Sequence, residues 1–437
     1  MGSLKQSTRD YIAETDVEAP GAKTAKLIEV TGSGGKRALR ALADGNRRAA
    51  DALLRMADDV ATQRAMVRAW ERGDVSTKEL ATSLRRYNEL DASQRAEFDD
   101  MVAVGGSDTV RMASKIDRDT LDTLTSRGCS RRLPSVGAAG APGTDNQYAV
   151  TGVAAQSSGG VCLSSEDIEE LQQGIARAAD GDEIDSYQDI DDAVETIERL
   201  DSDGQEAAAD LIGELDGEGV TVVNDADNLR NEVDGLSDDE ISDLLVSYDN
   251  YNDADIATRD VRTIQDDLNR IANEDDVEGL AEAIREKTNA GKSNMKGLDG
   301  EAEAARILIN NDDVTVEELS VDGQDGIKAE IPDEKVRESE VDVDVTTDQT
   351  IAVESKNRDY NNIPPVPEIR DEAVEDLRNK FNVLSRNRDQ IVIVSRTDNP
   401  EQNDIIQEAK AQADFPPDFD PEEDINFVSY DELSELE

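Results

Sequence analysis

Three residues near the C-terminus, Asp342, Glu354 and Lys356, have the types and the spacing to bind a metal ion and act on a phosphate. Asp342 lies in a segment in which valines alternate with carboxylates, 340–345. Glu354 and Lys356 end a second alternating segment, 351–356. A strand sends alternate side chains to opposite faces, and a short turn joins the two segments. We therefore expect a hairpin whose apolar side chains share one face and whose charged side chains share the other.

Two carboxylates on adjacent strands can hold a hard divalent cation that prefers oxygen ligands, such as Mg²⁺, with Mn²⁺ as the alternative. Lys356 can position or activate a water molecule, or neutralise charge on a phosphate in the transition state. Glu340 and Asp344 share the face of Asp342, and either is an alternative ligand. We prefer Asp342 because it lies in mid-strand at hairpin distance from Glu354.

The pattern of Asp342, followed twelve residues later by Glu354, Ser355 and Lys356, resembles the PD-(D/E)xK superfamily of restriction-endonuclease-like nucleases. The resemblance covers about residues 291–430, and it departs from the nominal motif because Val341 stands where that motif has proline. It implies that Asp342 and Glu354 bind a catalytic Mg²⁺, and that the backbone carbonyl of Ser355 is a further metal ligand.

The same resemblance extends to a helix that precedes the strands. Gly297 to Glu301, followed by small and apolar residues, is similar to the first helix of the superfamily, in which a glutamate faces the metal site. It implies a catalytic role for Glu301, with Glu303 as the second choice. The implied activity is a metal-dependent endonuclease that hydrolyses phosphodiester bonds, with DNA favoured over RNA as the substrate.

A bland interpretation of Glu354 and Lys356 stays open, namely a solvated strand face with a cross-strand ion pair. An acidic residue two positions before a lysine is a common pattern in so acidic a chain, and it recurs at 333–335 and 408–410. The first recurrence lies in a polar loop and the second on an expected helix. Neither ends an apolar strand, so neither has the context of Glu354.

The elements that must position these residues follow one another from residue 291 to residue 437. Hydrophobic periodicity predicts them in the order αβββαβαβ, which matches the restriction-endonuclease-like core. Ile391–Val394 is expected to be a buried strand at the centre of a mixed sheet. The expected elements are a helix at 301–310, strands at 314–319, 340–345 and 351–356, a helix at 368–385, a strand at 391–394, a helix at 401–412 and a strand at 426–428.

Upstream of this α/β domain the pattern is helical, which makes the fold class α+β overall. We expect a helical domain of near-neutral charge at 1–127, whose first thirty residues look weakly structured. A segment rich in Gly, Ser, Ala and Pro, 128–164, is expected to be a linker or long loop. An acidic helical domain should follow at 165–290. Capping signals for helix starts stand at Ser76, Ser164 and Ser237.

Composition narrows the functional classes. The chain has 437 residues with 101 Asp and Glu against 46 Lys and Arg, a formal net charge of −55. We interpret this as a halophile-type acidic protein, because at about 1 M salt the Debye length of about 3 Å screens the repulsion. The chain has no histidine, which excludes Ser-His-Asp and Cys-His catalysis. Its only cysteines are Cys129 and Cys162, which are too few for a four-cysteine zinc site, and their redox state stays open.

Two functions from different classes remain. The first is the Mg²⁺-dependent nuclease, acting as a toxin, defence effector or repair enzyme with a C-terminal nuclease domain. The second is a non-enzymatic helical interaction protein that keeps an inactive nuclease-like domain. Residues 1–132 hold 23 Lys and Arg against 21 Asp and Glu, which suggests a protein partner for the N-terminal region. No apolar run suits a membrane span or a signal peptide, so we expect a cytoplasmic protein without a membrane partner.

Overall fold

The computed structural model describes residues 4–56, 59–126, 163–180, 184, 186–252, 259–274, 277–288, 292–311, 314–321, 327–329, 337–339, 341–347, 349–356, 363–364, 366–396, 403–434 and 436. The chain divides into two compact units, Met1–Asn224 and Asp225–Glu437. The division falls inside one helix, α12 (Gly217–Glu232), rather than at the boundaries expected from the sequence. None of the described helices is long and apolar enough to cross a membrane.

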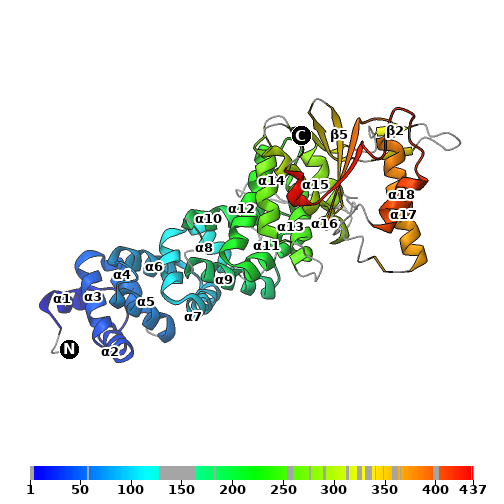
Figure 1. Cartoon of the computed structure of the whole chain (residues 1–437). Coiled ribbons are helices and arrows are strands. Elements are labelled where there is room, and N and C mark those ends of the chain that lie inside the picture. The colour runs from blue at the N-terminus through cyan, green and yellow to red at the C-terminus, as the bar shows by residue number, and fades with distance from the viewer. Residues whose placement is uncertain are drawn as a thin grey trace, which may run out of the picture. The chain divides into compact units, whose positions relative to one another are not determined.

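The first unit is built from helices in chain order, coloured blue to green in Figure 1. Ser76 caps α6 as the sequence predicted: its hydroxyl accepts from the Glu79 N–H, and the Glu79 carboxylate accepts from the Ser76 N–H at 2.7 Å. Hydrogen bonds from the side chain and the backbone N–H of Ser76 to the carboxylate lower the pKa of Glu79 to about 2. The helices are α1 (Gln6–Glu14), α2 (Pro20–Thr31), α3 (Ser33–Gly45), α4 (Arg47–Arg55), α5 (Val60–Arg72), α6 (Thr77–Glu89), α7 (Ala92–Lys115), α8 (Arg118–Leu124), α9 (Ser165–Asp180), α10 (Tyr187–Arg199), α11 (Ser202–Leu215) and the first half of α12.

The expectation of weak structure in the first thirty residues is wrong. α1 and α2 cover most of that segment, and each packs against α3. Tyr11 and Leu27 are buried, and the Tyr11 hydroxyl donates to Asp51 at 2.5 Å. α1 buries Thr8, Tyr11 and Ile12, and α2 buries Thr24 and Leu27, so polar threonines form part of the buried face of each helix.

Helices on the two sides of the expected linker pack against each other. α9 lies against α7, α8 and α11, and the Thr123 hydroxyl donates to Glu198 at 2.6 Å. Gly174 allows the close approach of α9 to α11, because a Cβ atom there would lie 2.1 Å from the Ile212 carbonyl oxygen. Most of the linker itself, with Cys129 and Cys162, lies outside the described residues. The domain scheme therefore stays a prediction, although α9 shares a unit with the helices before it.

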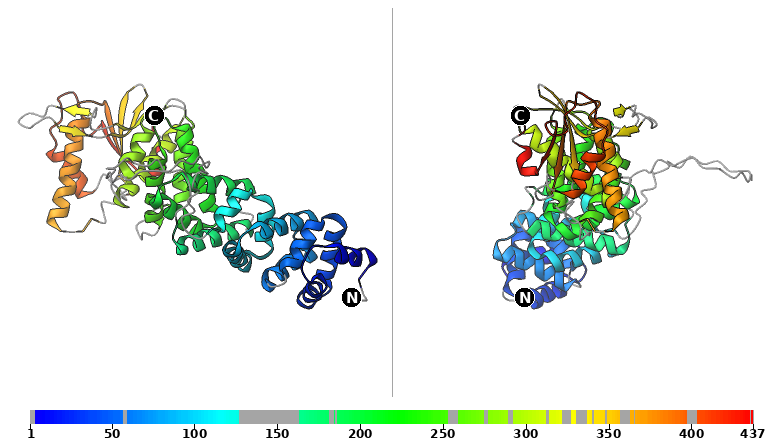
Figure 2. Two further views of the ribbon diagram at one scale, coloured as in Figure 1. Left: turned by 180° about the vertical axis from the view of Figure 1, so that it is seen from behind. Right: turned by 45° about the vertical axis from the view of Figure 1, so that its right-hand side comes forward.

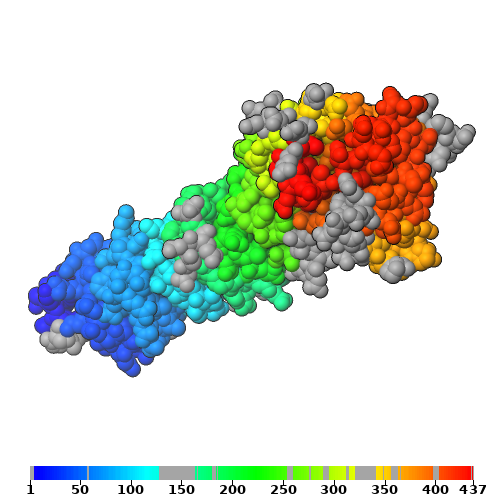
Figure 3. Space-filling model, in the orientation of Figure 1, coloured from blue at the N-terminus to red at the C-terminus, as the bar shows by residue number. Residues whose placement is uncertain are grey.

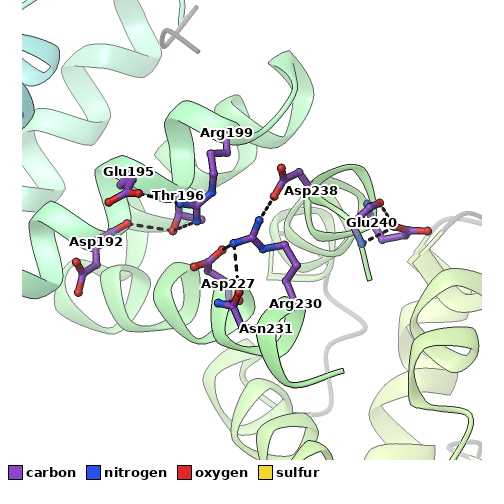
Figure 4. Close-up of polar contacts among 10 residues, drawn as sticks. Asp192, Glu195, Thr196, Arg199, Asp227, Arg230, Asn231, Asp238 and Glu240 are labelled. Carbon is purple, nitrogen blue, oxygen red and sulfur yellow. Dashed lines mark hydrogen bonds and ion pairs between the residues drawn. The ribbon is translucent and has the colours of Figure 1, made fainter. Parts of the chain in front are cut away.

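The second unit combines helices with a mixed sheet. Arg230 fixes the step from α12 to α13, with its guanidinium 3.0 Å from Asp227 and 2.8 Å from Asp238 (Figure 4). Its elements are the second half of α12, α13 (Asp238–Asn252), α14 (Val261–Ala272), α15 (Leu280–Thr288), α16 (Lys292–Ile309), β1 (Thr315–Val321), β2 (Ile327–Ala329), β3 (Arg337–Ser339), β4 (Val341–Thr346), β5 (Thr350–Lys356), α17 (Pro367–Leu384), β6 (Gln390–Ser395), α18 (Asp404–Gln412), β7 (Ile425–Val428) and α19 (Tyr430–Leu433).

Five strands form a mixed sheet in the order β1-β4-β5-β6-β7. β1, β4 and β5 pair antiparallel, while β6 runs parallel to β5 and β7 runs parallel to β6. The side chains of Ile391–Val394 are fully buried, which confirms the expected buried strand, but β6 lies next to the edge strand β7 and β5 is at the centre of the sheet. The short β2–β3 hairpin was not predicted. A helical chain with a C-terminal mixed sheet confirms the α+β class.

The sheet is covered on both faces. α17 and α18 lie on one face, where Leu377, Phe381 and Ile406 pack on Ala352 and Ile393. α16 lies on the other face (Figures 1 and 2). The short C-terminal α19, red in the space-filling view of Figure 3, packs against α16 on that same side. The two faces of β4 and β5 are therefore two different environments.

Candidate functional site

Asp342 and Glu354 face each other across β4 and β5. The antiparallel register pairs Val343 with Val353, and one further step places Asp342 opposite Glu354. The sequence predicted this shared face, and a solvated strand face was the alternative interpretation of Glu354 and Lys356. Asp342 is 4% exposed and Glu354 0%, because α17 packs over them. Buried carboxylates require hydrogen bonds or counter-charges, which must come from the elements around them.

The counter-charge comes from Lys380 on α17, a residue that the sequence analysis missed. Its ammonium nitrogen lies 2.5 Å from Glu354 Oε2 and 4.0 Å from Asp342 Oδ1. The Lys380 side chain is only 13% exposed. The signal was present in the sequence, since Lys380 falls at helical spacing between Leu377 and Leu384, within the apolar stripe that α17 buries.

Asp342 is held from the side of the strand as well. The backbone N–H of Ser355 donates to Asp342 Oδ2 at 2.7 Å in a buried hydrogen bond. This bond orients the carboxylate so that Oδ1 is the oxygen nearer to Lys380. A hydrogen bond from a backbone donor to a buried carboxylate is of the stronger, charge-assisted kind. Ser355 therefore acts on the pair through its N–H group.

The side chain of Ser355 lies on the opposite face of the sheet. Its hydroxyl is 2.8 Å from the hydroxyl of Tyr430 on α19. Burial raises the pKa of the Tyr430 hydroxyl, so this phenol stays neutral near pH 7. Since α19 packs against α16, Ser355 shows that α16 covers the face that does not carry Asp342 and Glu354.

Glu301 lies on α16 and thus on that opposite face. Its Oε1 is 2.9 Å from the ammonium of Lys287 on α15, and its side chain is 3% exposed. Glu303, the second choice, forms ion pairs with Arg259 and with Arg396, at 3.6 Å and 2.6 Å. The resemblance implied that a glutamate of this helix approaches the metal ligands. The structure places both glutamates behind the sheet, in contacts that join it to the preceding helices.

Of the two alternative ligands, Asp344 is held by a different partner. The guanidinium of Arg388 donates from Nε to Asp344 Oδ1 and from Nη2 to Oδ2, each at 2.7 Å. On the neighbouring strand, burial raises the pKa of Glu318, and the charges of Glu278 and Asp344 raise it further. Because the Arg388 guanidinium engages both carboxylate oxygens of Asp344, Asp342 is the better candidate metal ligand. Glu340 lies outside the described residues.

Lys356 is described only by its backbone. It ends β5 and pairs with Ser395 in β6, while its side chain lies outside the described part of the structure. The predicted site residues are thus distributed unequally. Asp342 and Glu354 come together with the Ser355 N–H, Glu301 lies on the opposite face, and the role of Lys356 stays a prediction.

The donor set suits a small hard cation with few protein ligands. Mg²⁺ is usually bound by one or two carboxylates and completes its shell with water or phosphate oxygens. Asp342 and Glu354 supply two carboxylates, and the ammonium of Lys380 already marks a position favourable for positive charge. Over the described ranges, no group of three or more acidic or cysteine side chains is placed to hold a metal ion. The fit therefore rests on the two carboxylates.

Comparisons with protein-family models, with curated proteins and with solved structures found no match to this chain.

Proposed function

We propose that the chain is a metal-dependent nuclease with a restriction-endonuclease-like C-terminal domain, hydrolysing phosphodiester bonds of DNA in preference to RNA. The observation that carries the proposal is the buried pair of Asp342 and Glu354, opposite each other on adjacent strands with a lysine ammonium beside both. The order of α16, β1, β4, β5, α17, β6, α18 and β7 supports it, because it has the element order expected for that fold.

In this proposal the chain's residues hold and orient the reacting groups. Asp342 and Glu354 would bind Mg²⁺ or Mn²⁺, and the ion would supply charge neutralisation and an acidified water. The Ser355 N–H keeps the Asp342 carboxylate oriented, and the Ser355 carbonyl is a further candidate ligand. Lys356 would orient the attacking water or stabilise charge on the phosphate. Glu301 has no part in this scheme, since it lies behind the sheet.

A test of the proposal uses the purified full chain in KCl at a concentration that keeps it folded. Labelled DNA and RNA, single- and double-stranded, are incubated with Mg²⁺, with Mn²⁺ and with EDTA. We expect cleavage of DNA that requires the divalent ion, because two buried carboxylates without a metal provide no electrophile. Absence of cleavage with every substrate and both ions would sink the nuclease proposal.

The structure also offers support for the non-enzymatic alternative. Glu354 is fully buried and its carboxylate lies 2.5 Å from an ammonium, as in an ion pair that only stabilises the fold. In that case α17 never exposes the pair, and the helical first unit carries the function by binding a partner. The nuclease test above separates the two, since a structural ion pair predicts no dependence on divalent ions.

A row of exposed arginines on α5 in the first unit favours an anionic partner, whether or not the C-terminal domain is a nuclease. Arg64, Arg68 and Arg72 lie at successive four-residue steps on α5 and are exposed. Glu71 is the only carboxylate in α5, and it pairs with Arg37. No ion pair joins the three arginines to any residue that the structure describes. In a chain with more than twice as many acidic as basic residues, a stripe of arginines without an ion pair to the described residues suits the phosphates of a nucleic acid.

The stripe predicts a salt-dependent effect. Replacing Arg64, Arg68 and Arg72 together by glutamine should weaken binding of fluorescent DNA and lower the slope of log K against log salt by about 0.9 per lost phosphate contact. The matched control replaces Arg40, Arg47 and Arg118, which are ion-paired in the structure, and should leave the slope nearly unchanged. Equal losses in both triple variants would mean that only net charge matters.

The setting of this activity is part of the proposal. The acid excess supports a protein of a halophile-type cell, and a nuclease domain behind long helical modules suits a toxin or defence effector. We place that activity in the cytoplasm.

A further inference from the structure

Lys380 occupies the position where a metal ion would meet both carboxylates. Its ammonium is 2.5 Å from Glu354 Oε2 and 4.0 Å from Asp342 Oδ1, while Asp342 Oδ2 is already bonded to the Ser355 N–H. Glu354 Oε2 and Asp342 Oδ1, the oxygens paired with the ammonium, are thus also candidate metal ligands. The side chains of Lys380, Glu354 and Asp342 are 13%, 0% and 5% exposed, so water screens this group poorly.

A divalent ion and the ammonium cannot share this position. Mg²⁺ binds oxygen at about 2.0–2.1 Å, so an ion on Glu354 Oε2 would overlap the ammonium that lies 2.5 Å from the same atom. Two cations side by side in a poorly screened site also repel each other strongly. The lysine stem has four flexible carbons, so the ammonium can leave while the backbone of α17 stays in place.

We propose that the ammonium of Lys380 is the resident cation of the Asp342–Glu354 pair, and that a divalent metal ion binds by exchange with it. The inference rests on the proposed function only in taking the pair as a metal site. It adds that Lys380 sets the metal affinity and keeps the pair charge-compensated when no metal is bound. The exchange also removes an ion pair between α17 and the strands β4 and β5.

The test measures Mn²⁺ binding by titration calorimetry to the full chain at fixed KCl, without any substrate. Lys380→Met removes the competing charge and keeps the length of the side chain. It should bind Mn²⁺ at this site at least about tenfold more tightly than the parent, because no ammonium must be displaced. Lys380→Arg keeps the charge and should not gain affinity. Binding that disappears in Asp342→Asn is assigned to this site rather than to the acidic surface.

Lys410→Met is the matched control. Lys410 lies on α18 in the same unit, with a side chain that is 10% exposed and an ammonium 3.7 Å from Glu422. It loses the same charge at similar burial without touching the pair, so its Mn²⁺ affinity should equal that of the parent. Circular dichroism verifies that each variant is folded. If Lys380→Met does not fold without metal, Lys380→Gln replaces it, since glutamine keeps a neutral donor.

The outcomes separate this inference from the nuclease proposal. Unchanged or weaker Mn²⁺ binding in folded Lys380→Met or Lys380→Gln overturns the exchange, even if the parent cleaves DNA. Absence of site-specific Mn²⁺ binding in parent and variants overturns it as well. Tighter binding in the variants of a protein that cleaves nothing upholds the exchange and rejects the nuclease activity.

Discussion

Replacement of Glu354 by glutamine is expected to lower metal-dependent cleavage by at least about 10²-fold, the scale of losing a preorganised charge in an active site. Glutamine keeps the shape of the side chain and removes only the charge that binds the ion. Asp342→Asn should have the same effect, since Asp342 is the cross-strand partner in the pair. Lys356→Ala should also slow cleavage by about 10², but it should leave metal binding intact. The measurement is the single-turnover rate with Mg²⁺.

Glu354→Gln also breaks a buried ion pair, so a control must separate loss of metal binding from loss of stability. In Glu354→Gln the ammonium of Lys380 keeps no carboxylate at 2.5 Å, and loss of one partner of a buried ion pair costs about 3–5 kcal/mol. The double variant Glu354→Gln, Lys380→Met removes both charges and should recover most of that stability, while staying inactive. Asp344→Asn breaks the pair with Arg388 but not the metal pair, so it should keep cleavage. Parent-like rates in folded Glu354→Gln and Lys356→Ala would show that this is not a nuclease site.

Local pattern was enough to predict the two carboxylates that the structure brings together. The alternation of valines with acids fixes which face of β4 carries Asp342, and the short turn fixes its register against β5. The run of apolar residues in β6 likewise marks a strand covered on both faces. These features depend on residues that are neighbours in the chain, so they can be predicted from a single sequence.

The features that the sequence did not predict depend on how distant elements pack. Lys380 meets Glu354 only because α17 crosses this face of the sheet, and nothing in the alternation of β4 and β5 says which helix covers them. The same packing buries Asp342 and Glu354, which speaks against the alternative of a solvated strand face. The position of Glu301 could not be predicted for the complementary reason. The resemblance put its helix near the metal ligands, whereas its partner Lys287 lies on α15, a helix that the sequence assigned to the preceding domain.

The contact between α15 and α16 bears on a second prediction, which concerns where the C-terminal domain begins. From the sequence, residues 291–437 should fold alone, because they contain the whole sheet and its covering helices. The structure gives a reason to expect otherwise. Backbone hydrogen bonds join Glu278 N–H to the Glu317 carbonyl at 2.9 Å and Leu319 N–H to the Glu278 carbonyl at 3.0 Å, so the segment before α15 extends the edge of the sheet at β1.

The charges on α16 depend on the same preceding helices. Asp299 is fully buried, with Arg259 Nε at 2.5 Å and the Tyr251 hydroxyl at 2.9 Å. Glu301 has Lys287 at 2.9 Å. A cut at residue 291 removes all three partners together with α13, α14 and α15, so it exposes the face of α16 that those helices cover. Since a domain is stable by only about 5–15 kcal/mol, loss of the packing of three helices on α16 is a large fraction of that stability.

We therefore expect residues 225–437 to fold as a fragment and residues 291–437 to lack a cooperative transition under the same KCl concentration. Thermal unfolding followed by circular dichroism, with amide-proton dispersion by NMR, distinguishes the two. A cooperative transition of unmodified 291–437 at the midpoint of 225–437 would contradict this argument and uphold the boundary at 290.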